Sequence, residues 1–171
     1  VAPDLMTMGK AIGGGVMPLG AFSATPELWK IFEENPLIHS STFGGNPLAC
    51  RAGLATLEVM KEEDLPAQAA RKGEWLMGKL RELSEQYPDL VVQVRGMGLI
   101  IGVEFSHDDI GGLMIAALAQ RHILVAYTLN NPTVMRFEPA LNMPDELLEE
   151  VVTAFAEGLA QTREILASLE M

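Results

Sequence analysis

The sequence has little cysteine, histidine or positive charge, and each shortage excludes a class of protein. The single cysteine, Cys50, cannot form an internal disulfide, which is typical of a reducing compartment such as the cytoplasm. The three histidines lack metal-ligand spacing, so we expect no metal site. With 23 acidic and 12 basic residues the net charge is -11, unlike the basic face that nucleic-acid binding requires. No apolar run reaches the ~18 residues of a membrane span, so we expect no membrane partner.

The bulk composition is that of a folded globular protein. Of the 171 residues, 49% are hydrophobic and 20% are charged, which is typical of soluble domains. This length predicts one domain, or one domain and part of another. The chain opens with Val-Ala-Pro-Asp instead of a start methionine, a stretch typical of a loop leading into a strand. We therefore expect the chain to be the later part of a longer protein.

The first 60 residues combine short strand patterns with two helix starts. Residues 5–24 predict two short, mostly buried strands around a triple-glycine turn. A Thr-Pro-Glu sequence then opens a helix at Thr25, which should end near Asn35. Asn46 and the proline after it start a second helix that is apolar on most sides. Such a helix is expected to be buried.

A longer amphipathic helix from Asp64 to Tyr87 precedes a segment of different texture, in which β-branched runs predict strands. The further expected elements are strands at 90–94 and 99–105, a helix at 109–121, strands at 123–127 and 134–138, and a helix from Pro144. We therefore divide the chain into residues 1–87 and a compact α+β domain of residues 88–171.

Lys10 is the only charged residue between Asp4 and Glu27, and it lies in an apolar, glycine-rich stretch. Burying a lysine ammonium is costly, so apolar surroundings favour the neutral amine. A neutral lysine amine is a nucleophile suited to forming a Schiff base. The alternative is an ordinary surface lysine. A phosphate-binding P-loop is excluded, because in that motif the lysine follows the glycines.

The segment Ser40–Pro47 reads Ser-Ser-Thr-Phe-Gly-Gly-Asn-Pro and is a second candidate site. Its glycines allow close approach of the backbone to a ligand, its hydroxyls are donors, and a helix N-terminus follows directly. Together these features favour an anion pocket. The alternative is a hydroxyl-rich loop with an ordinary helix cap.

Arg136 lies among apolar residues on an expected strand. An arginine in such a position can hold a substrate carboxylate through two parallel hydrogen bonds. Equally, it can lie on the solvent face beside Glu138, which is two residues away on the same side of the strand. The local sequence favours this second, structural interpretation.

Taken together, these segments resemble the later half of a class III pyridoxal-phosphate-dependent aminotransferase, and the resemblance covers essentially the whole chain. The matching stretches, in the family's order, are Pro3-Asp-Leu-Met-Thr-Met-Gly-Lys-Ala-Ile-Gly-Gly-Gly15, Pro18-Leu-Gly-Ala21, His39-Ser-Ser-Thr-Phe-Gly-Gly-Asn-Pro-Leu-Ala49, Arg95-Gly-Met-Gly-Leu99 and Arg136-Phe-Glu-Pro139. Thr128–Asn131 and Tyr87–Leu90 resemble the putrescine aminotransferase branch, with ornithine and acetylornithine aminotransferases as close neighbours. The resemblance implies an α/β, fold type I pyridoxal-phosphate-dependent transferase, of which this chain supplies the closing part of the large domain and the small C-terminal α+β domain.

The resemblance also implies roles for four residues. Lys10 would form the Schiff base with pyridoxal 5'-phosphate and then carry a proton between substrate and cofactor carbons. Thr42, with Ser41 beside it, would bind the cofactor phosphate from the partner subunit of a homodimer whose active site lies at the subunit interface. Arg136 would hold the carboxylate of 2-oxoglutarate or glutamate. The implied reaction transfers an amino group to 2-oxoglutarate from a diamine such as putrescine, or from ornithine or acetylornithine.

Three of the family's cofactor-binding features lie upstream of the lysine and have no counterpart here. They are the glycine/serine loop that holds the phosphate, the aromatic residue that stacks on the cofactor ring, and the aspartate that pairs with the pyridine nitrogen, which Asp4 does not match. We therefore expect this chain alone to be inactive. One alternative is a non-catalytic interaction or dimerisation module folded around residues 88–171. A more distant one is a lysine-dependent decarboxylase or racemase on the same scaffold.

Overall fold

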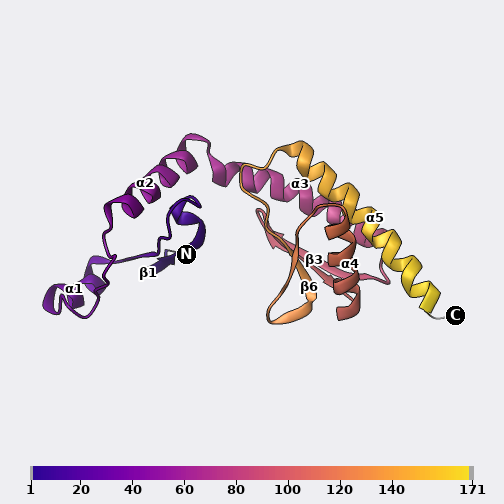
Figure 1. Ribbon diagram of the computed structural model, residues 1–171, viewed down its shortest axis with the longest axis horizontal. Helices are drawn as coiled ribbons and strands as arrows, with labels where there is room; N and C mark the ends of the chain where they lie inside the picture. Colours follow the sequence, from indigo (N-terminus) through magenta and orange to yellow (C-terminus); the bar gives the residue numbers. More distant parts are fainter. Residues whose placement is uncertain (1, 170–171) are drawn as a thin grey trace. The chain divides into compact units, whose positions relative to one another are not determined.

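The computed structural model describes residues 2–169, and the chain divides into two compact units (Figure 1). The first unit is Val1–Asp64 and the second is Leu65–Met171. This division differs from the predicted border near residue 88, because the long helix that starts at Leu65 packs with the elements that follow it. The assignment of residues 1–87 and 88–171 to the family's large and small domains stays a prediction.

The predicted order of helices and strands is confirmed in both units. In the first unit the elements are β1 (Leu5–Met8), the short 3-10 helix η1 (Lys10–Gly13), β2 (Ala21–Ala24), α1 (Pro26–Glu34) and α2 (Pro47–Glu62). In the second unit they are α3 (Leu65–Gln86), β3 (Val91–Met97), β4 (Ile100–Phe105), α4 (Asp108–Gln120), β5 (Ala126–Thr128), β6 (Asn131–Phe137) and α5 (Asp145–Leu169).

In the first unit, β1 and β2 form an antiparallel pair that runs from Leu5 opposite Ala24 to Met8 opposite Ala21. The chain between them contains η1, which packs against α2. Gly53 on α2 makes this packing possible, because a Cβ added there would lie only 2.6 Å from a methyl carbon of Leu19. The glycine therefore brings α2 close to the loop that carries Lys10.

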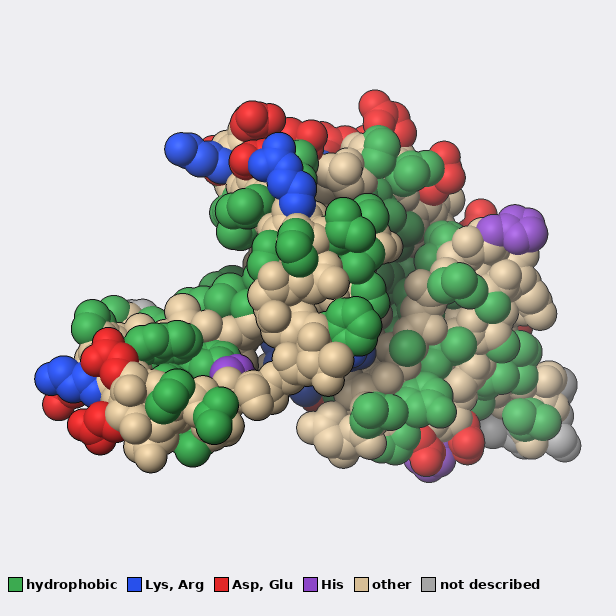
Figure 2. All heavy atoms as spheres, turned by 60° about the vertical axis from the view of Figure 1, so that its left-hand side comes forward, with side chains coloured by type: hydrophobic (Ala, Val, Ile, Leu, Met, Phe, Trp, Pro, Cys, Tyr) green, Lys and Arg blue, Asp and Glu red, His purple; other side chains and the backbone are tan. Residues whose placement is uncertain are grey.

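The expected burial of the first unit is wrong for this chain. Among its described residues only Gly13, Ala49 and Gly53 are buried. Two short strands and two helices offer too few layers to enclose an apolar core, and hydrophobic side chains accordingly form much of the visible surface in Figure 2. The exposed large apolar residues of this unit are Leu5, Met6, Val16, Leu28, Trp29, Ile31, Leu37, Ile38, Phe43, Leu48, Leu54, Leu57 and Val59.

The second unit has a core of its own. Its four strands form an antiparallel sheet in the order β3-β4-β6-β5. Along β4, Ile101, Val103 and Phe105 are buried while Gly102 and Glu104 lie on the opposite, open face. The apolar face packs against the helices, and the fully buried side chains include Leu76, Leu80, Met114, Leu118, Met135, Phe155 and Leu159.

Two close contacts join α3 to the rest of the second unit. Gly73 lies against the β3–β4 turn, and a Cβ added there would sit 2.0 Å from the carbonyl oxygen of Gly98. The neighbouring Lys72 is buried, and its ammonium donates to the carbonyl oxygen of Met143 at 2.7 Å and to Oε1 of Gln68 at 3.0 Å. Lys72 thereby fastens α3 to the connection that runs from β6 to α5. None of the helices in residues 2–169 combines the length and the hydrophobicity that a membrane-spanning helix needs.

Candidate active site

Lys10 is the first residue of η1 and has an unusual backbone conformation. Its φ is 56°, in the left-handed region that residues with a Cβ seldom occupy. The turn continues with Gly14, also left-handed, whose N–H donates to the carbonyl oxygen of Ala11 at 2.9 Å. Such a conformation costs a non-glycine residue about 1–3 kcal/mol, and Asp64 and His122 adopt it as well, with φ 47° and 62°.

The side chain of Lys10 is exposed in this chain. Within the described residues the Lys10 amine makes no hydrogen bond and no ion pair. The apolar residues around Lys10 in the sequence therefore do not enclose it, since they belong to the sparsely packed first unit. Only the backbone of η1 is fixed, through its packing on α2.

Ser41 and Thr42 lie in an exposed turn before α2. The N–H of Gly44 donates to the carbonyl oxygen of Ser41 at 3.1 Å, and Gly45 has φ 71°, which favours glycine. Just before this turn, His39 packs edge-on against Phe22 with ring centroids 5.0 Å apart. That aromatic contact anchors the start of the segment.

The N-terminus of α2 is already capped, which changes the expected anion pocket. The side-chain oxygen of Asn46 accepts from the N–H of Leu48 at 3.0 Å and of Ala49 at 3.2 Å. The N–H of Cys50 donates to the carbonyl oxygen of Asn46, and Pro47 has no N–H to offer. The helix amides that were expected to bind an anion are therefore occupied. The hydroxyls of Ser41 and Thr42, both on exposed residues, are among the groups of this segment that the cap does not use.

Arg136 lies on the open face of the sheet, where its neighbours are small. In the register of the sheet it stands opposite Gly102 on β4 and Ala126 on β5. Its guanidinium forms one ion pair, from Nη2 to Oε2 of Glu138 at 3.5 Å, and both side chains are about half exposed. Arg136 thus lies beside Glu138 on the solvent face of the sheet, as the structural interpretation predicts. Its guanidinium remains accessible to a carboxylate.

Arg95 lies on the same face of the sheet and has more side-chain partners than Arg136. It also stands opposite Gly102, from the β3 side. Its Nη1 donates to Oε1 of Gln93 at 2.7 Å and is ion-paired to Glu104, which is more buried than Glu138. Arg95 therefore braces the sheet, while Arg136 keeps the freer guanidinium.

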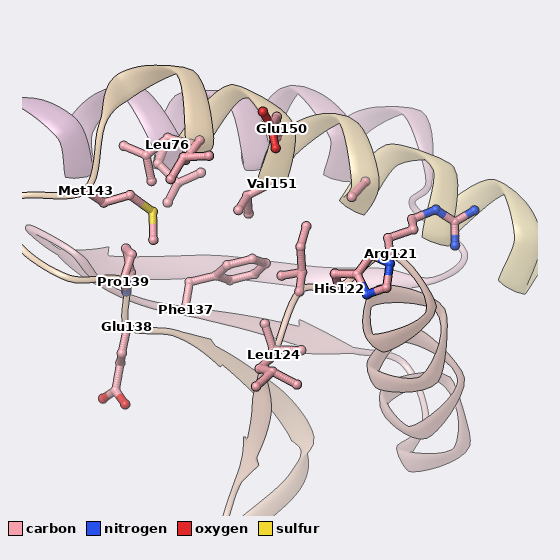
Figure 3. A pocket seen from close by; sticks show the side chains of 15 residues that line it. Leu76, Arg121, His122, Leu124, Phe137, Glu138, Pro139, Met143, Glu150 and Val151 are labelled. Carbon is pink, nitrogen blue, oxygen red and sulfur yellow. The ribbon is translucent and has the colours of Figure 1, made fainter.

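A cavity of about 290 Å³ lies beside Arg136, lined by Leu124, Val125, Ala126, Arg136 and Glu138. A larger apolar pocket of about 470 Å³ adjoins it behind β6. Figure 3 shows Phe137 pointing into that larger pocket towards Val151, and Glu138 pointing the other way. Alternation along β6 therefore places Glu138 with Arg136 on the open face.

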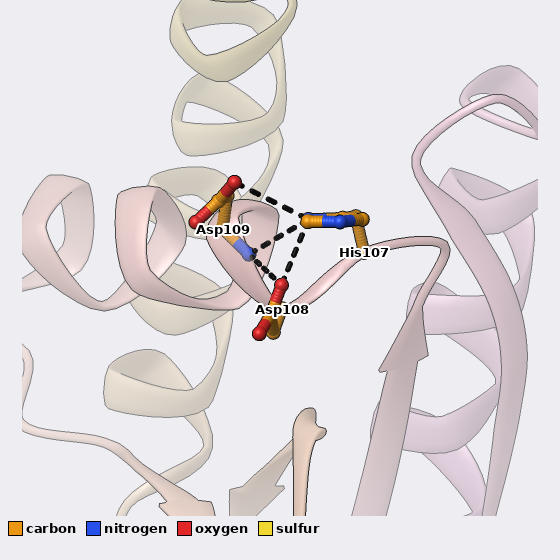
Figure 4. Close-up of side chains that lie close together, drawn as sticks. All are labelled: His107, Asp108 and Asp109. Carbon is orange, nitrogen blue, oxygen red and sulfur yellow. Dashed lines mark hydrogen bonds and ion pairs between the residues drawn. The ribbon is translucent and has the colours of Figure 1, made fainter.

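His107, Asp108 and Asp109 gather at the start of α4 (Figure 4). Nδ1 of His107 lies 2.8 Å from Asp108 and 3.3 Å from Asp109, and it accepts from the Asp109 N–H. All three residues are exposed. Their arrangement is that of a helix N-cap with two acidic residues in the first turn, which stabilises α4.

The predicted site residues belong to both units of the chain. Lys10, Ser41 and Thr42 belong to the first unit, and Arg136 belongs to the second. The predicted helix cap at Asn46 is confirmed, since its side-chain oxygen closes the α2 N-terminus. The Asn-Pro pair that starts this helix was the signal for it.

Comparison with known proteins decides the family. The sequence model of the family described as aminotransferase class III matches residues 1–159. This chain belongs to that family. The match spans η1, the Ser41–Thr42 turn and Arg136, so all four candidate residues of this aminotransferase chain fall within it.

Solved aminotransferases have the same fold. An ornithine aminotransferase from Toxoplasma gondii, with pyridoxal phosphate partially occupying its active site, is 31% identical with a TM-score of 0.86, over 95% of this chain and 38% of that one. An acetylornithine aminotransferase from Elizabethkingia anophelis is 30% identical with a TM-score of 0.85, over 94% and 40% of the two chains. A Bacillus anthracis aminotransferase is 26% identical with a TM-score of 0.85, over 94% and 39%. The predicted α/β aminotransferase fold is confirmed, and the chain spans about two fifths of the length of these proteins.

The chemistry of the candidate residues fits pyridoxal phosphate. Lys10 supplies a primary amine without a hydrogen-bonding partner among the described residues, and a primary amine is the group that reacts with an aldehyde. Ser41 and Thr42 supply exposed hydroxyls, which are donors for a phosphate. This set covers two of the cofactor's functional groups, the aldehyde and the phosphate.

Proposed function

We propose that this chain is the C-terminal part of a pyridoxal-phosphate-dependent aminotransferase. The observation that carries the proposal is the unpaired amine of Lys10, held by a left-handed backbone in a turn that packs on α2. The family match over residues 1–159 supports it. Fixing the backbone while leaving the amine free suits a group that must bond covalently to a ligand and then be released.

Each candidate residue has a separate task in this proposal. When bound, pyridoxal phosphate supplies the electron sink that stabilises negative charge on the substrate carbon. The amine of Lys10 would hold the cofactor through its aldehyde and, once released, would take up the proton lost by the substrate carbon. The hydroxyls of Ser41 and Thr42 donate hydrogen bonds to the phosphate. Arg136 orients a substrate carboxylate through its guanidinium.

The substrates proposed are 2-oxoglutarate and an amino donor, which is a diamine such as putrescine, or ornithine or acetylornithine. Similarity at 30–31% identity to an ornithine and an acetylornithine aminotransferase supports a donor with a basic or substituted distal nitrogen, and the putrescine-like stretches favour a diamine. We further propose a cytoplasmic homodimer, in which Thr42 reaches the cofactor of the partner subunit.

The proposal includes the inactivity of the 171 residues on their own. Three observations support it: the chain spans 38–40% of the two relatives named above, Lys10 is exposed, and the first unit buries almost none of its large apolar residues. Further aminotransferase polypeptide, on the same or another chain, would cover these surfaces.

One observation favours a second candidate function. The second unit encloses its own core, whereas the first does not. A protein that kept only the second unit as its folded part could act as a non-catalytic interaction or dimerisation module. In that case residues 1–64 would be digested by protease while residues 65–171 survive.

An amino-transfer assay on the product of the complete coding sequence tests the proposal. We expect glutamate to form from 2-oxoglutarate with a diamine, ornithine or acetylornithine as donor, and the Lys10→Ala variant to lose this activity. Lys30→Ala, a variant of another exposed lysine of the first unit, should keep it. Amino transfer that survives in Lys10→Ala would refute the proposal, and strong turnover by the 171 residues alone would refute their proposed inactivity.

A further inference from the structure

The connection from α1 to α2 carries Ser41 and Thr42, and it is attached to the rest of the first unit near each of its ends. At its end, the side chain of Asn46 caps α2. Near its start, the ring of His39 packs against other rings. The large apolar side chains of the connection provide little further anchorage, because they are exposed: Leu37 at 86%, Ile38 at 59% and Phe43 at 78%.

His39 belongs to an aromatic cluster, which consists of Phe22 on β2, Trp29 and Phe32 on α1, and His39 itself. The His39 ring lies edge-on to Phe22 at an interplanar angle of 86°, with ring centroids 5.0 Å apart, and its centroid is 5.6 Å from that of Phe32. This edge-to-face geometry is one that aromatic pairs prefer. The imidazole makes no hydrogen bond and no ion pair with any described residue. Ring packing therefore holds His39 in place.

The other three rings of the aromatic cluster contact one another without His39. Ring centroids are 5.4 Å apart for Phe22 and Trp29, 5.8 Å for Phe22 and Phe32, and 5.0 Å for Trp29 and Phe32. Phe22 also stands opposite Thr7 in the β1–β2 pair, and β1 leads to Lys10. Removing the His39 ring would therefore release the start of the connection and leave the strands beside Lys10 as they are.

Hydrogen bonds inside the connection fix its local shape but do not orient it. The Gly44 N–H donates to the carbonyl oxygen of Ser41, and the Asn46 N–H donates to that of Phe43, each at 3.1 Å. Both bonds lie within the segment, so they would move with it. The direction in which Ser41 and Thr42 present their hydroxyls thus depends on the two attachments, at His39 and at Asn46.

We propose that His39 is a positioning residue for the cofactor phosphate, which holds the Ser41–Thr42 turn in place through the aromatic cluster. The inference rests on the proposed function, in which these two hydroxyls bind that phosphate. Donors that are ordered before the ligand arrives bind it more tightly, because ordering a loop on binding costs conformational entropy. His39 acts through the turn and does not itself contact the phosphate.

Binding of two forms of the cofactor by the complete protein tests this role. Pyridoxal phosphate and pyridoxal share the aldehyde, and only the first carries a phosphate. Both are titrated by the absorbance of the bound chromophore. His39→Ala should weaken binding of pyridoxal phosphate about three- to tenfold, the range expected for lost aromatic contacts, and should change pyridoxal binding by less than about twofold.

Two further variants separate the ring of His39 from its polar nitrogens. His39→Phe keeps a ring for the aromatic cluster and should retain the wild-type ratio of the two affinities. His39→Gln keeps a polar group without a ring and should behave like His39→Ala. Leu37→Ala is the matched control, since it shortens an 86% exposed side chain of the same connection, and it should leave both affinities unchanged.

The ratio of the two affinities distinguishes positioning of the turn from a general loss of structure, which would weaken both ligands together. Three results would overturn the inference. They are an unchanged ratio in His39→Ala, equal weakening of both ligands, and failure of His39→Phe to restore the ratio, which would show that the imidazole itself binds the phosphate.

Failure of the inference and failure of the proposed function give different results. A complete protein that binds neither pyridoxal phosphate nor pyridoxal would refute the proposed function, and the inference with it. Binding of both with a ratio that His39→Ala leaves unchanged would refute the inference alone. A ratio that moves as expected in a protein without amino transfer would refute the proposed reaction and leave the role of His39 standing.

Discussion

Two identical substitutions in the same helix should have opposite effects on stability. Gly73 and Gly78 both lie inside α3, where alanine is a better helix former than glycine by up to about 1 kcal/mol. A Cβ on Gly78 meets nothing within 4 Å. On Gly73 it meets three backbone atoms of Gly98, the carbonyl oxygen at 2.0 Å, the carbonyl carbon at 2.2 Å and Cα at 2.7 Å. Real Cβ contacts essentially never fall below 3.0 Å, so α3 or the β3–β4 turn would have to move.

The cost of that movement sets the expected magnitude. Overpacking a close-packed site costs about 1–3 kcal/mol, and the turn cannot yield easily because Gly98 is held at φ 56°. After the helix-propensity gain is subtracted, Gly73→Ala should lower the free energy of unfolding by about 1–2 kcal/mol. Gly78→Ala should raise it by about 0.5–1 kcal/mol.

Urea unfolding followed by far-ultraviolet circular dichroism measures both effects, and the difference in midpoint between the two variants is the decisive quantity. A Gly73→Ala variant as stable as Gly78→Ala would refute the close approach of α3 to the β3–β4 turn.

Two further stability predictions concern the helix ends. Replacing Asn46 by Ala removes the oxygen that accepts from two amides of α2, and should lower the stability of this helix by about 1 kcal/mol. The loss is measured as a decrease in helicity on mild heating. Unchanged helicity would show that the cap is dispensable. The hydrogen bond from Arg71 holds the pKa of Asp145 below that of an ordinary aspartate, so this carboxylate stabilises the fold above pH ~4 and its contribution is lost as the pH falls through the lowered pKa. Asp145→Asn should therefore flatten the acid limb of the stability curve, and an acid limb identical to that of wild type would contradict this account.

The sequence predicts the second unit well because its patterns are short-range. Alternating apolar residues on β4 and the stripe of Leu76 and Leu80 on α3 point to one face each, and that face is buried within the same unit. For the first unit, the same reasoning predicts buried helices and strands, whereas most of their apolar side chains are exposed. The apolar positions of α2, such as Leu48 and Leu54, indicate a buried helix, but residues that would cover them are not among the elements of that unit.

The candidate site divides in the same way. Local sequence makes Lys10 and the Ser40–Pro47 segment candidates, and the roles of Lys10, Ser41, Thr42 and Arg136 are what the family resemblance implies. The pairing of Arg136 with Glu138 follows from strand alternation. What the sequence does not show is conformation. The left-handed backbone of Lys10 depends on packing against α2, and the buried ammonium of Lys72 depends on carbonyl groups about 70 residues away. Such contacts join distant segments, and no local pattern encodes them.

The most direct test of the central proposal is to find the atom that bonds to the cofactor. The complete protein is incubated with pyridoxal phosphate, reduced with borohydride, digested and mapped by mass spectrometry. We predict the pyridoxyl group on Lys10, with Lys30, Lys61, Lys72 and Lys79 unmodified. A label on any of those four lysines in place of Lys10, or no label at all, would contradict the assignment of Lys10 as the cofactor-binding lysine.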